Sequence, residues 1–350
     1  MGHAGRMNLR LLVAATAASL ALAACSSSSD STQKASPEPS KGTAKQLVEV
    51  SPLTGKAMKK GRPDNPVFVV KIENTIGGAP QYGLDQADLV IEELVEGGLT
   101  RLAAFYYSSL PSKVGHVRSL RTSDIGIAGP VGGQIVASGG ATGAYNKVKG
   151  AGIKVFSEDD GAPGFSSDPL KVRPYNRLID LKTVARNAKA TTIPGPYLPW
   201  SPGSDPTPKP SSSTGATPTP KPKKATTATV RFSPSTATSW ALKGRKWVRT
   251  NGHAEAGKDF EADTMIVLSC RVGDAGYTDP AGNPVPETVF EGSGEARIFH
   301  GNRVTSVTWV KPGLTKGLRF RTADGKPYRI EPGKVFLELV PEGDGGVSFS

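Results

Sequence analysis

The sequence predicts an α+β protein, in which a layered, α/β-like N-terminal domain with a mixed sheet precedes a mostly antiparallel β domain. Three observations lead to this prediction. Apolar, strand-like runs alternate with glycine-marked turns and helical patterns within residues 47–198. Residues 229–345 are nearly free of helical periodicity and carry hairpin patterns instead. A Pro/Thr/Lys-rich stretch at 199–228 separates the two parts and is typical of an extended linker, or of an insertion in a surface loop of one domain.

Strands and helices are mixed in the first part. Val67 to Ile72 is a run of β-branched and aromatic residues that predicts a buried strand, and Leu99 to Tyr107 is similar. The periodicity of Asp88 to Val95 fits a helix or a strand. Gln134 to Ser138 is expected to be a short strand. Helical patterns cover residues 144–149 and 178–189, so a layered domain is expected.

Hairpins dominate the second part. Residues 296–299 and 304–310 flank the turn His300-Gly301-Asn302, which is a hairpin signal. A second hairpin is expected around Asp324-Gly325. Val335 to Val340 supplies a closing strand, so this part is expected to form a small antiparallel sheet or barrel.

Residues 1–25 have the order of a lipoprotein signal peptide. Arg6 and Arg10 form a basic region, and Leu11 to Ala24 is an uncharged Ala/Leu-rich core that is too short to span a bilayer. Leu22-Ala23-Ala24-Cys25 then has the spacing at which lipoproteins are cut and acylated, for example with palmitate. The alternative is an ordinary secretory peptide cut elsewhere, and translation can start at Met1 or Met7.

Lipidation of Cys25 predicts an extracytoplasmic protein that is anchored to the cell membrane. Residues 26–46 contain almost nothing to bury, so they are expected to form a disordered tether. Cys270 is the only other cysteine and is expected to lie buried in a strand. The net charge of +12 is spread thinly along the chain, which argues against a nucleic-acid partner. Cell-wall polymers, anionic glycans and envelope proteins are the partners that this location favours.

Arginines form the strongest candidate binding site. Arg118 and Arg121 stand three residues apart with a serine hydroxyl between them, and guanidinium groups bind phosphate and carboxylate bidentately. The segment can be extended, or turn helical at Arg118. The alternative is that both arginines pair with Glu92, Glu93 or Glu96 inside the domain. The ligand-binding residues that we predict are Asn74, Glu96, Arg101, Arg118, Arg121 and Asp124.

No recognisable catalytic set is present, and neither a cofactor nor a metal is expected. A Glu92/Glu96 pair with Asp124 is a weak candidate for acid–base chemistry on a glycan. The small-residue turn Ser138 to Gly143 precedes a helical pattern and is interpreted as a tight structural turn, or as an anion site at the helix N-terminus.

Several motifs resemble those of the YerB-like lipoproteins, a bacterial family of two consecutive domains of unknown function. The motifs in the first part are Ile72-Glu73-Asn74, Pro80-Gln81-Tyr82-Gly83-Leu84, Ala87-Asp88-Leu89-Val90, Glu93 to Arg101 and Val117-Arg118-Ser119-Leu120-Arg121. Those in the second part are Asn251-Gly252-His253, Asp263 to Val267, Gly292 to Ala296 and Thr308-Trp309. The resemblance covers residues 50–342 apart from the linker and implies two domains, but it carries over no catalytic residue.

The order of Asp88, the arginine-rich segment and Gly139-Gly140 is also similar to the layout of LytR-CpsA-Psr phosphotransferases, although the spacings differ and the distinctive Arg-Asp pair of those enzymes is absent. The leading hypothesis is therefore an envelope lipoprotein that binds an anionic or glycan ligand through its arginines. The alternative is a wall-modifying enzyme, either a transferase acting on pyrophosphoryl-linked glycans or a glycan hydrolase.

Overall fold

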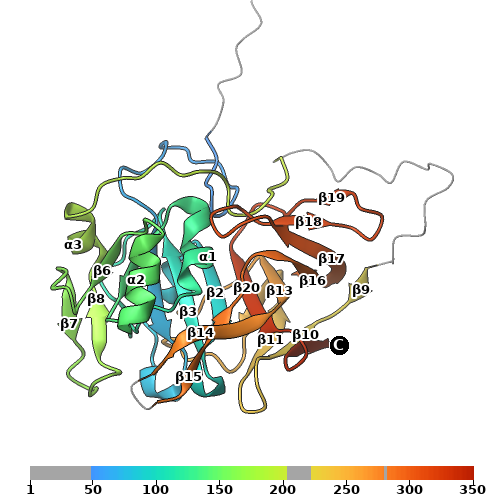
Figure 1. Ribbon diagram of the computed structural model, residues 1–350. Helices are drawn as coiled ribbons and strands as arrows, with labels where there is room; N and C mark the ends of the chain where they lie inside the picture. Colours follow the sequence, from blue (N-terminus) through green and yellow to red (C-terminus); the bar gives the residue numbers. More distant parts are fainter. Residues whose placement is uncertain (1–48, 203–221, 280–281) are drawn as a thin grey trace, which may run out of the picture. The chain divides into compact units, whose positions relative to one another are not determined.

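A single twelve-stranded sheet runs through both parts of the chain in the computed structural model, which describes residues 49–202, 222–279 and 282–350 (Figure 1). The predicted signal peptide, Cys25, the tether and most of the predicted linker lie outside the described residues. In pairing order the strands are β19 (Pro327–Tyr328), β18 (Arg319–Arg321), β17 (Arg303–Lys311), β16 (Gly292–His300), β13 (Thr264–Cys270), β20 (Val335–Pro341), β2 (Leu89–Leu94), β3 (Thr100–Tyr106), β1 (Phe68–Glu73), β5 (Gln134–Ala137) and β6 (Val155–Ser157), with β9 (Lys223–Lys224) beside β17.

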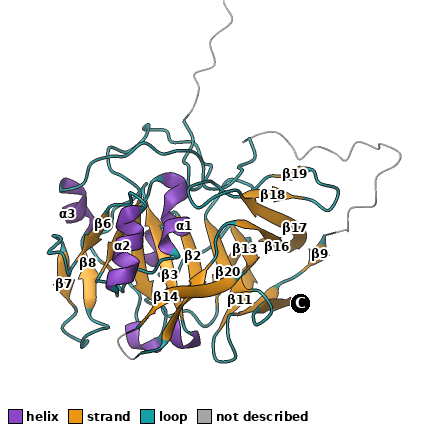
Figure 2. Ribbon diagram, in the orientation of Figure 1, coloured by secondary structure: helices purple, strands orange, loops and turns teal. Residues whose placement is uncertain are grey.

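Three smaller sheets and a few short helices surround this sheet. The small sheets are β12 (Lys246–Arg249), β11 (Ala237–Lys243), β10 (Thr227–Arg231) and β21 (Gly346–Phe349); β14 (Val272–Thr278) and β15 (Pro284–Thr288); and β4 (Val114–Gly115), β8 (Arg177–Ile179) and β7 (Phe165–Ser167). The α-helices are α1 (Asp124–Ala128), α2 (Thr142–Gly150) and α3 (Leu181–Arg186), and the 3₁₀ turns are η1 (Ile76–Gly78), η2 (Leu84–Gln86), η3 (Glu96–Gly98) and η4 (Gly129–Val131). Figure 2 shows that the labelled helices gather beside the N-terminal strands.

Strand β20 joins the two parts of the chain. It pairs in parallel with β13 on one side, where Leu337 lies opposite Ile266, and in parallel with β2 on the other, where Leu337 lies opposite Ile91. All seven residues of β20 are buried. A strand that is covered on both faces needs a nearly continuous apolar sequence, and the segment Val335 to Val340 has one, interrupted only by Glu338.

The two faces of the sheet carry separate hydrophobic clusters, because successive side chains of a strand point to opposite faces. Val69, Ile91 and Leu337 lie on the face that packs against α1 and α2, which we call the α1 face. Val70 and Phe336 lie on the opposite face, which packs against the sheet of β10, β11 and β12 and which we call the β11 face.

The predicted fold class is confirmed. The strands expected at residues 67–72, 99–107 and 134–138 and both C-terminal hairpins are present, and the ambiguous segment Asp88 to Val95 forms β2. Two expectations were wrong. Residues 178–189 divide into the end of β8 and the short helix α3. Residues 335–340 are not a closing strand but lie near the centre of the sheet, because only a position buried on both faces covers their apolar side chains.

The division into two domains near residues 199–228 stays a prediction about the chain's organisation. Strands from both parts hydrogen bond in one sheet, and each hydrophobic cluster contains residues of both parts. The hydrophobic core is therefore shared across the proposed boundary.

Residues 49–66 pack at one end of the central strands. The Gly333 amide, just before β20, donates to the carbonyl oxygen of Thr54 (2.8 Å). Asn65 donates to the carbonyl oxygen of Tyr107, just after β3 (3.4 Å). The described chain therefore enters at the end where β1 and β20 begin, and the opposite end is where β1 and β2 finish.

Cys270 lies at the end of β13 and is fully buried, as expected, and burial raises the pKa of its thiol. Within residues 49–202, 222–279 and 282–350, no helix has the length and apolar character needed to cross a membrane.

The central position of β20 predicts that both parts unfold together. Leu337→Ala removes buried side-chain volume between Ile266 and Ile91, which costs about 2–5 kcal/mol. We expect one urea transition, seen equally by tryptophan fluorescence and by hydrogen exchange in β1 and β3. Val347→Ala, in the half-buried strand β21, is the control and should cost less. Two separate transitions in the wild type would contradict this prediction.

Candidate functional site

Ionisable side chains gather at the end of the sheet where β1 and β2 finish and β3 begins. In the antiparallel pairing of β3 with its neighbours, Arg101 lies opposite Glu73 of β1 and opposite Glu93 of β2. Residues directly opposite each other on antiparallel strands point to the same face. These three side chains therefore continue the α1 face, and all three are at least nine-tenths buried.

Lys71 carries a buried ion-pair network on this face. Its ammonium group contacts Glu93 Oε1 and lies 2.6 Å from Asp124 Oδ1, and all three side chains are inaccessible to solvent. Burial alone would lower the pKa of Lys71, but the charges and hydrogen bonds of Asp124 and Glu93 raise it. Burial raises the pKa of Glu93. Asp124 also accepts a hydrogen bond from the Arg121 amide (2.7 Å), so the network fixes the start of α1.

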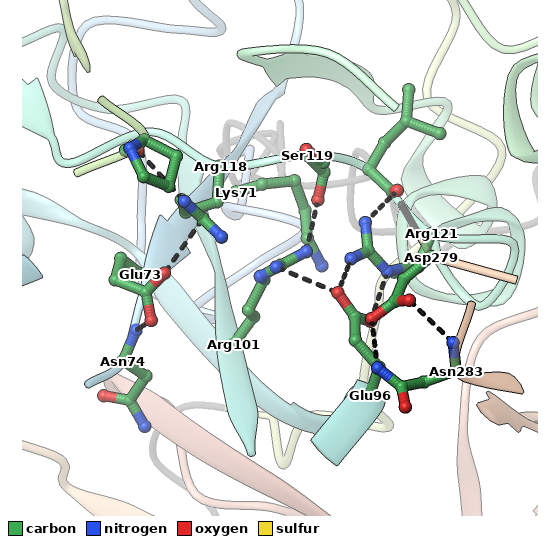
Figure 3. A network of polar contacts seen from close by, with 12 residues as sticks. Lys71, Glu73, Asn74, Glu96, Arg101, Arg118, Ser119, Arg121, Asp279 and Asn283 are labelled. Carbon is green, nitrogen blue, oxygen red and sulfur yellow. Dashed lines mark hydrogen bonds and ion pairs between the residues drawn. The ribbon is translucent and has the colours of Figure 1, made fainter. Parts of the chain in front are cut away.

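The three predicted arginines pair with two carboxylates, because Arg101 and Arg121 share Glu96 and Arg118 contacts Glu73, as Figure 3 shows from close by. Arg121 Nε donates to Glu96 Oε2 (2.9 Å), and Arg101 Nη2 lies 3.2 Å from Glu96 Oε1. Arg118 Nε lies 2.9 Å from Glu73 Oε2 as an ion pair without hydrogen-bond geometry. Arg118 Nη1 donates to the Pro174 carbonyl oxygen (3.0 Å). The segment from Arg118 to Arg121 is not helical, so the two guanidinium groups do not form one fork.

Cations are crowded around Arg101. Burial and the adjacent Arg121 lower the pKa of Arg101 to about 10, with a further contribution from Arg118. The pKa of Glu96 is lowered: burial opposes this, but the hydrogen bond from Arg121 and the charges of Arg101 and Arg121 outweigh it. The positive charges of Arg101 and Arg121 therefore favour an anionic group beside them.

A cavity of about 100 Å³ opens beside these arginines, and we call it the arginine cavity. Arg101 and Arg118 line it together with Tyr175, whose ring centroid lies 5.1 Å from the Arg118 guanidinium carbon. The Tyr175 ring packs closely against Gly77, where an added Cβ would lie 2.9 Å from the ring. The remaining lining residues are Glu73, Thr75, Val95, Glu96, Leu99 and Thr100.

On the β11 face, Glu92 and Glu338 form a buried pair of carboxyl groups. They lie opposite each other in the parallel pairing of β2 with β20, so the two carboxyl groups interact directly. Trp240 Nε1 donates to Glu338 Oε1 (2.7 Å), and the Thr238 hydroxyl donates to Glu92 (3.0 Å). Burial raises the pKa of both carboxyl groups. Two carboxyl groups in contact cannot both be ionised at little cost, so we infer that the pair holds a proton.

Asn74 links this pair to the second part of the chain. Its amide nitrogen donates to Glu92 Oε1 (2.9 Å), and its amide oxygen accepts from Arg249 Nη1 (3.1 Å) and Gln81 Nε2 (3.0 Å). Arg249 also pairs with Asp259 (2.6 Å). The charge of Arg249 is therefore compensated.

A larger cavity of about 310 Å³ lies over this face, and we call it the amide cavity. The residues that line it are Asn74, Thr75, Glu92, Leu99, Thr100, Ser235, Thr236, Ala237, Thr238, Arg249, Asn251, Gly252 and His253. It shares Thr75, Leu99 and Thr100 with the arginine cavity. The two cavities therefore adjoin at the end of the sheet, one associated with each face.

The structure brings some predicted site residues together and separates others. Arg101, Arg118 and Glu96 line the arginine cavity, and Asn74 lines the amide cavity. Arg121 lines neither cavity but holds Glu96, and Asp124 is held by Lys71. Glu92, Glu96 and Asp124 belong to three different networks, so they do not converge as an acid–base set.

Residues from the second part were missed by sequence reasoning. Arg249 hydrogen bonds to Asn74 across 175 residues of sequence, and the only signal for Arg249 and His253 was the Asn251-Gly252-His253 motif. Glu338 was the one charged residue in an apolar strand, which is a usable signal for a buried polar role. No feature of the sequence indicates a role for Tyr175 in the site.

A side chain of the protein itself fills the space beside the turn at Ser138 to Gly143. A Cβ added at Gly139 would lie 2.1 Å from the Asp159 carboxylate, so this carboxylate fills the space beside the turn. This favours the interpretation as a structural turn.

Two family descriptions match successive parts of the chain. "Protein of unknown function (DUF3048) N-terminal domain" matches residues 53–194, and "Protein of unknown function (DUF3048) C-terminal domain" matches residues 228–337. A relative from Bacillus subtilis (strain 168), "Putative lipoprotein YerB", is 48% identical over 80 residues, which are 23% of this chain and 23% of that protein.

The crystal structure of the YerB protein from Bacillus subtilis has a similar fold. Its TM-score is 0.67 at 19% sequence identity, and the match covers 86% of this chain and 99% of that chain. The two family matches, the relative and this structure together confirm the resemblance that the sequence motifs indicate.

The proton held by Glu92 and Glu338 predicts a pH dependence of stability. Between the unfolded pKa of 4.5 and the raised folded values, the folded protein binds more protons than the unfolded chain. Stability from this pair is therefore fully present below the unfolded pKa and is lost as the pH rises through the folded pKa. Because glutamine keeps a donor and an acceptor without ionising, we expect Glu338→Gln to lose less stability than the wild type between about pH 5 and 8 in urea titrations.

The control for this comparison is Glu261→Gln, at an exposed position, which should leave the pH profile unchanged. A Glu338→Gln profile that runs parallel to the wild-type profile would show that the pair holds no proton.

Proposed function

The chain belongs to the family of proteins with DUF3048 N-terminal and C-terminal domains. We propose that it is an extracytoplasmic, lipid-anchored protein of the cell envelope that binds an anionic ligand in the arginine cavity. The anchor in this proposal is an acyl group on Cys25. The ligand is a phosphate or carboxylate group of a wall polymer or glycan.

One observation carries the binding proposal: the guanidinium groups of Arg101 and Arg118 line the same cavity beside the ring of Tyr175. Arg118 Nε is buried and donates a hydrogen bond to no residue that the structure describes. Its contact with Glu73 Oε2 (2.9 Å) lacks hydrogen-bond geometry, so an oxyanion in the cavity can compete with Glu73 for this guanidinium group through charge-assisted hydrogen bonds. Arg121, which lines no cavity, acts in this proposal as a positioning residue through Glu96.

The carboxylates in the cavity wall act as internal counterions in this proposal. Glu73 is the partner of Arg118, so a ligand anion competes with it for the same guanidinium group. Such competition keeps the arginines paired in the free protein and makes binding dependent on ligand charge and on ionic strength.

Support for the anchor comes from the sequence and from the relative. The signal-like segment ends at Leu22-Ala23-Ala24-Cys25, and the name of the Bacillus subtilis relative describes a lipoprotein. Two acyl chains, or one chain and a second signal, hold a protein stably at a membrane.

Exchange of residues in the arginine cavity tests the binding proposal. Arg118→Gln removes a charged donor, worth about 1.5–3 kcal/mol, so we expect its affinity for poly(glycerol phosphate) to be about 10- to 100-fold weaker in calorimetric titrations. Glu73→Gln removes the competing carboxylate and should bind the polymer more tightly than the wild type.

The matched control is Arg173→Gln. This arginine lies on the neighbouring loop, its side chain is 66% exposed, and it pairs with Glu158 outside the cavity lining. Equal affinities of the wild type, Arg118→Gln and Glu73→Gln would rule out the arginine cavity as the binding site and would leave the arginines a purely structural role.

The anchor is tested separately at Cys25. Cys25→Ser removes the thiol that is acylated, so we expect it to lose incorporation of an alkyne-labelled palmitate and to leave the membrane fraction of expressing cells. Cys270→Ala, at the only other cysteine, should keep both the label and the membrane location. Label retained by Cys25→Ser would refute acylation at this position.

A further inference from the structure

The amide cavity differs in chemistry from the arginine cavity that it adjoins. We propose that the amide cavity binds the neutral, hydroxyl-rich ring of a sugar, so that the two cavities together take an acidic glycan. This inference rests on the proposed function for the acidic group of the ligand, whereas the sugar ring is assigned from the amide cavity alone.

Charge in the amide cavity disfavours an anion. Glu92 lines this cavity and lies beside the buried Glu338, and burial raises the pKa of both carboxyl groups, so this pair offers an anion no countercharge. The cation that lines the cavity, Arg249, is engaged by Asp259 (2.6 Å) and by the amide oxygen of Asn74 (3.1 Å). An incoming anion would meet the carboxyl pair without gaining a free guanidinium group, but a neutral ligand avoids this cost.

The open hydrogen-bonding groups of the cavity are uncharged. The side chains of Thr75, Thr236 and His253 line the cavity and make no hydrogen bond to any residue that the structure describes. Burial and the nearby Arg249 lower the pKa of His253, so its ring is neutral at neutral pH, with one nitrogen a donor and the other an acceptor. A sugar hydroxyl also donates and accepts, and it therefore matches these groups.

An apolar surface lies at the junction of the cavities. Leu99 lines both of them, and this large hydrophobic residue remains 44% exposed. The C–H face of a sugar ring that packs on Leu99 would remove this surface from water. The ring of Tyr175 lies on the other side of the junction, in the arginine cavity.

The dimensions agree with this assignment. The amide cavity of about 310 Å³ lies at the lower end of the ~300–1,000 Å³ typical of small-molecule sites. The arginine cavity adds about 100 Å³ and shares Thr75, Leu99 and Thr100 with the amide cavity. A ring in the larger space and an acidic substituent in the smaller space therefore suit a ligand of one or two sugar units.

Two disaccharides that differ by one carboxylate test the inference. Chitobiose is neutral, whereas N-acetylglucosaminyl-N-acetylmuramic acid carries a lactyl carboxylate on a similar frame. We expect the purified full-length mature chain to bind both and to prefer the acidic one. Thr236→Val and His253→Ala each remove hydrogen-bonding groups of the amide cavity, so both should weaken the binding of both sugars up to about tenfold.

Arg118→Gln separates the two proposals. It should abolish the preference for the acidic sugar and leave the affinity for chitobiose unchanged. Thr308→Val, at an exposed threonine of β17, is the control and should bind both sugars as the wild type does. Thermal unfolding of each variant identifies any loss of fold, and two independent variants of the amide cavity keep the test decisive.

Each outcome decides one proposal. No binding of chitobiose to the wild type, or unchanged binding in both Thr236→Val and His253→Ala, overturns the sugar assignment even if the acidic sugar still binds through Arg118. A preference for the acidic sugar that survives in Arg118→Gln overturns the arginine cavity as the anion site, and the sugar assignment then stands on chitobiose alone.

Discussion

The parallel pairing of β20 with both β13 and β2 is the constraint on which the rest of the structure depends. It inserts a strand from the C-terminal part between strands of the two parts, and its side chains enter the hydrophobic clusters of both faces. Backbone hydrogen bonds and apolar burial therefore act together across the chain's proposed domain boundary. The same pairing sets Glu338 beside Glu92, so the contact that joins the two parts also builds the floor of the amide cavity.

Side chains alternate between the two faces of the sheet along β2 and β3, which explains why two chemically different cavities lie so close together. Neighbouring residues on a strand point to opposite faces, so Glu92 and Glu93 enter different networks. The α1 face receives ion pairs among lysine, arginine and carboxylate side chains. The β11 face receives a carboxyl pair and neutral amide and hydroxyl groups. One end of one sheet therefore carries a cavity lined by arginines and a cavity lined mainly by uncharged polar groups, and the two adjoin at Thr75, Leu99 and Thr100.

Local sequence patterns predicted most of the strands, because apolar runs bounded by turn residues depend on neighbours in the chain. The order of the strands could not be predicted in the same way. Nothing within the segment Val335 to Val340 indicates that its partners are β13 and β2, since a continuous apolar run fits several central positions. Residues 178–189 also show the limit of periodicity, because a short strand and a short helix together imitate one longer helix.

The candidate site was predictable only in part for a similar reason. Arg101 and Arg118 lie within one dense polar segment, and their convergence needed the pairing of β1 with β3 and the bridge between Ile72 and Val117. Arg249 and His253 come from the far part of the chain, and their role depends on long-range packing that composition does not encode. The sequence predicts acidic partners for the arginines, but it points to Glu92, Glu93 and Glu96 and not to Glu73.

Residues 49–66 pack where β1 begins, whereas both cavities lie where β1 ends. The two ends of the central strands therefore differ: one contacts this N-terminal segment and the other carries the cavities. A strand of six residues spans about 20 Å, at roughly 3.3 Å per residue. None of residues 49–66 lines either cavity, so a ligand in the cavities is held at the other end of the central strands from this segment.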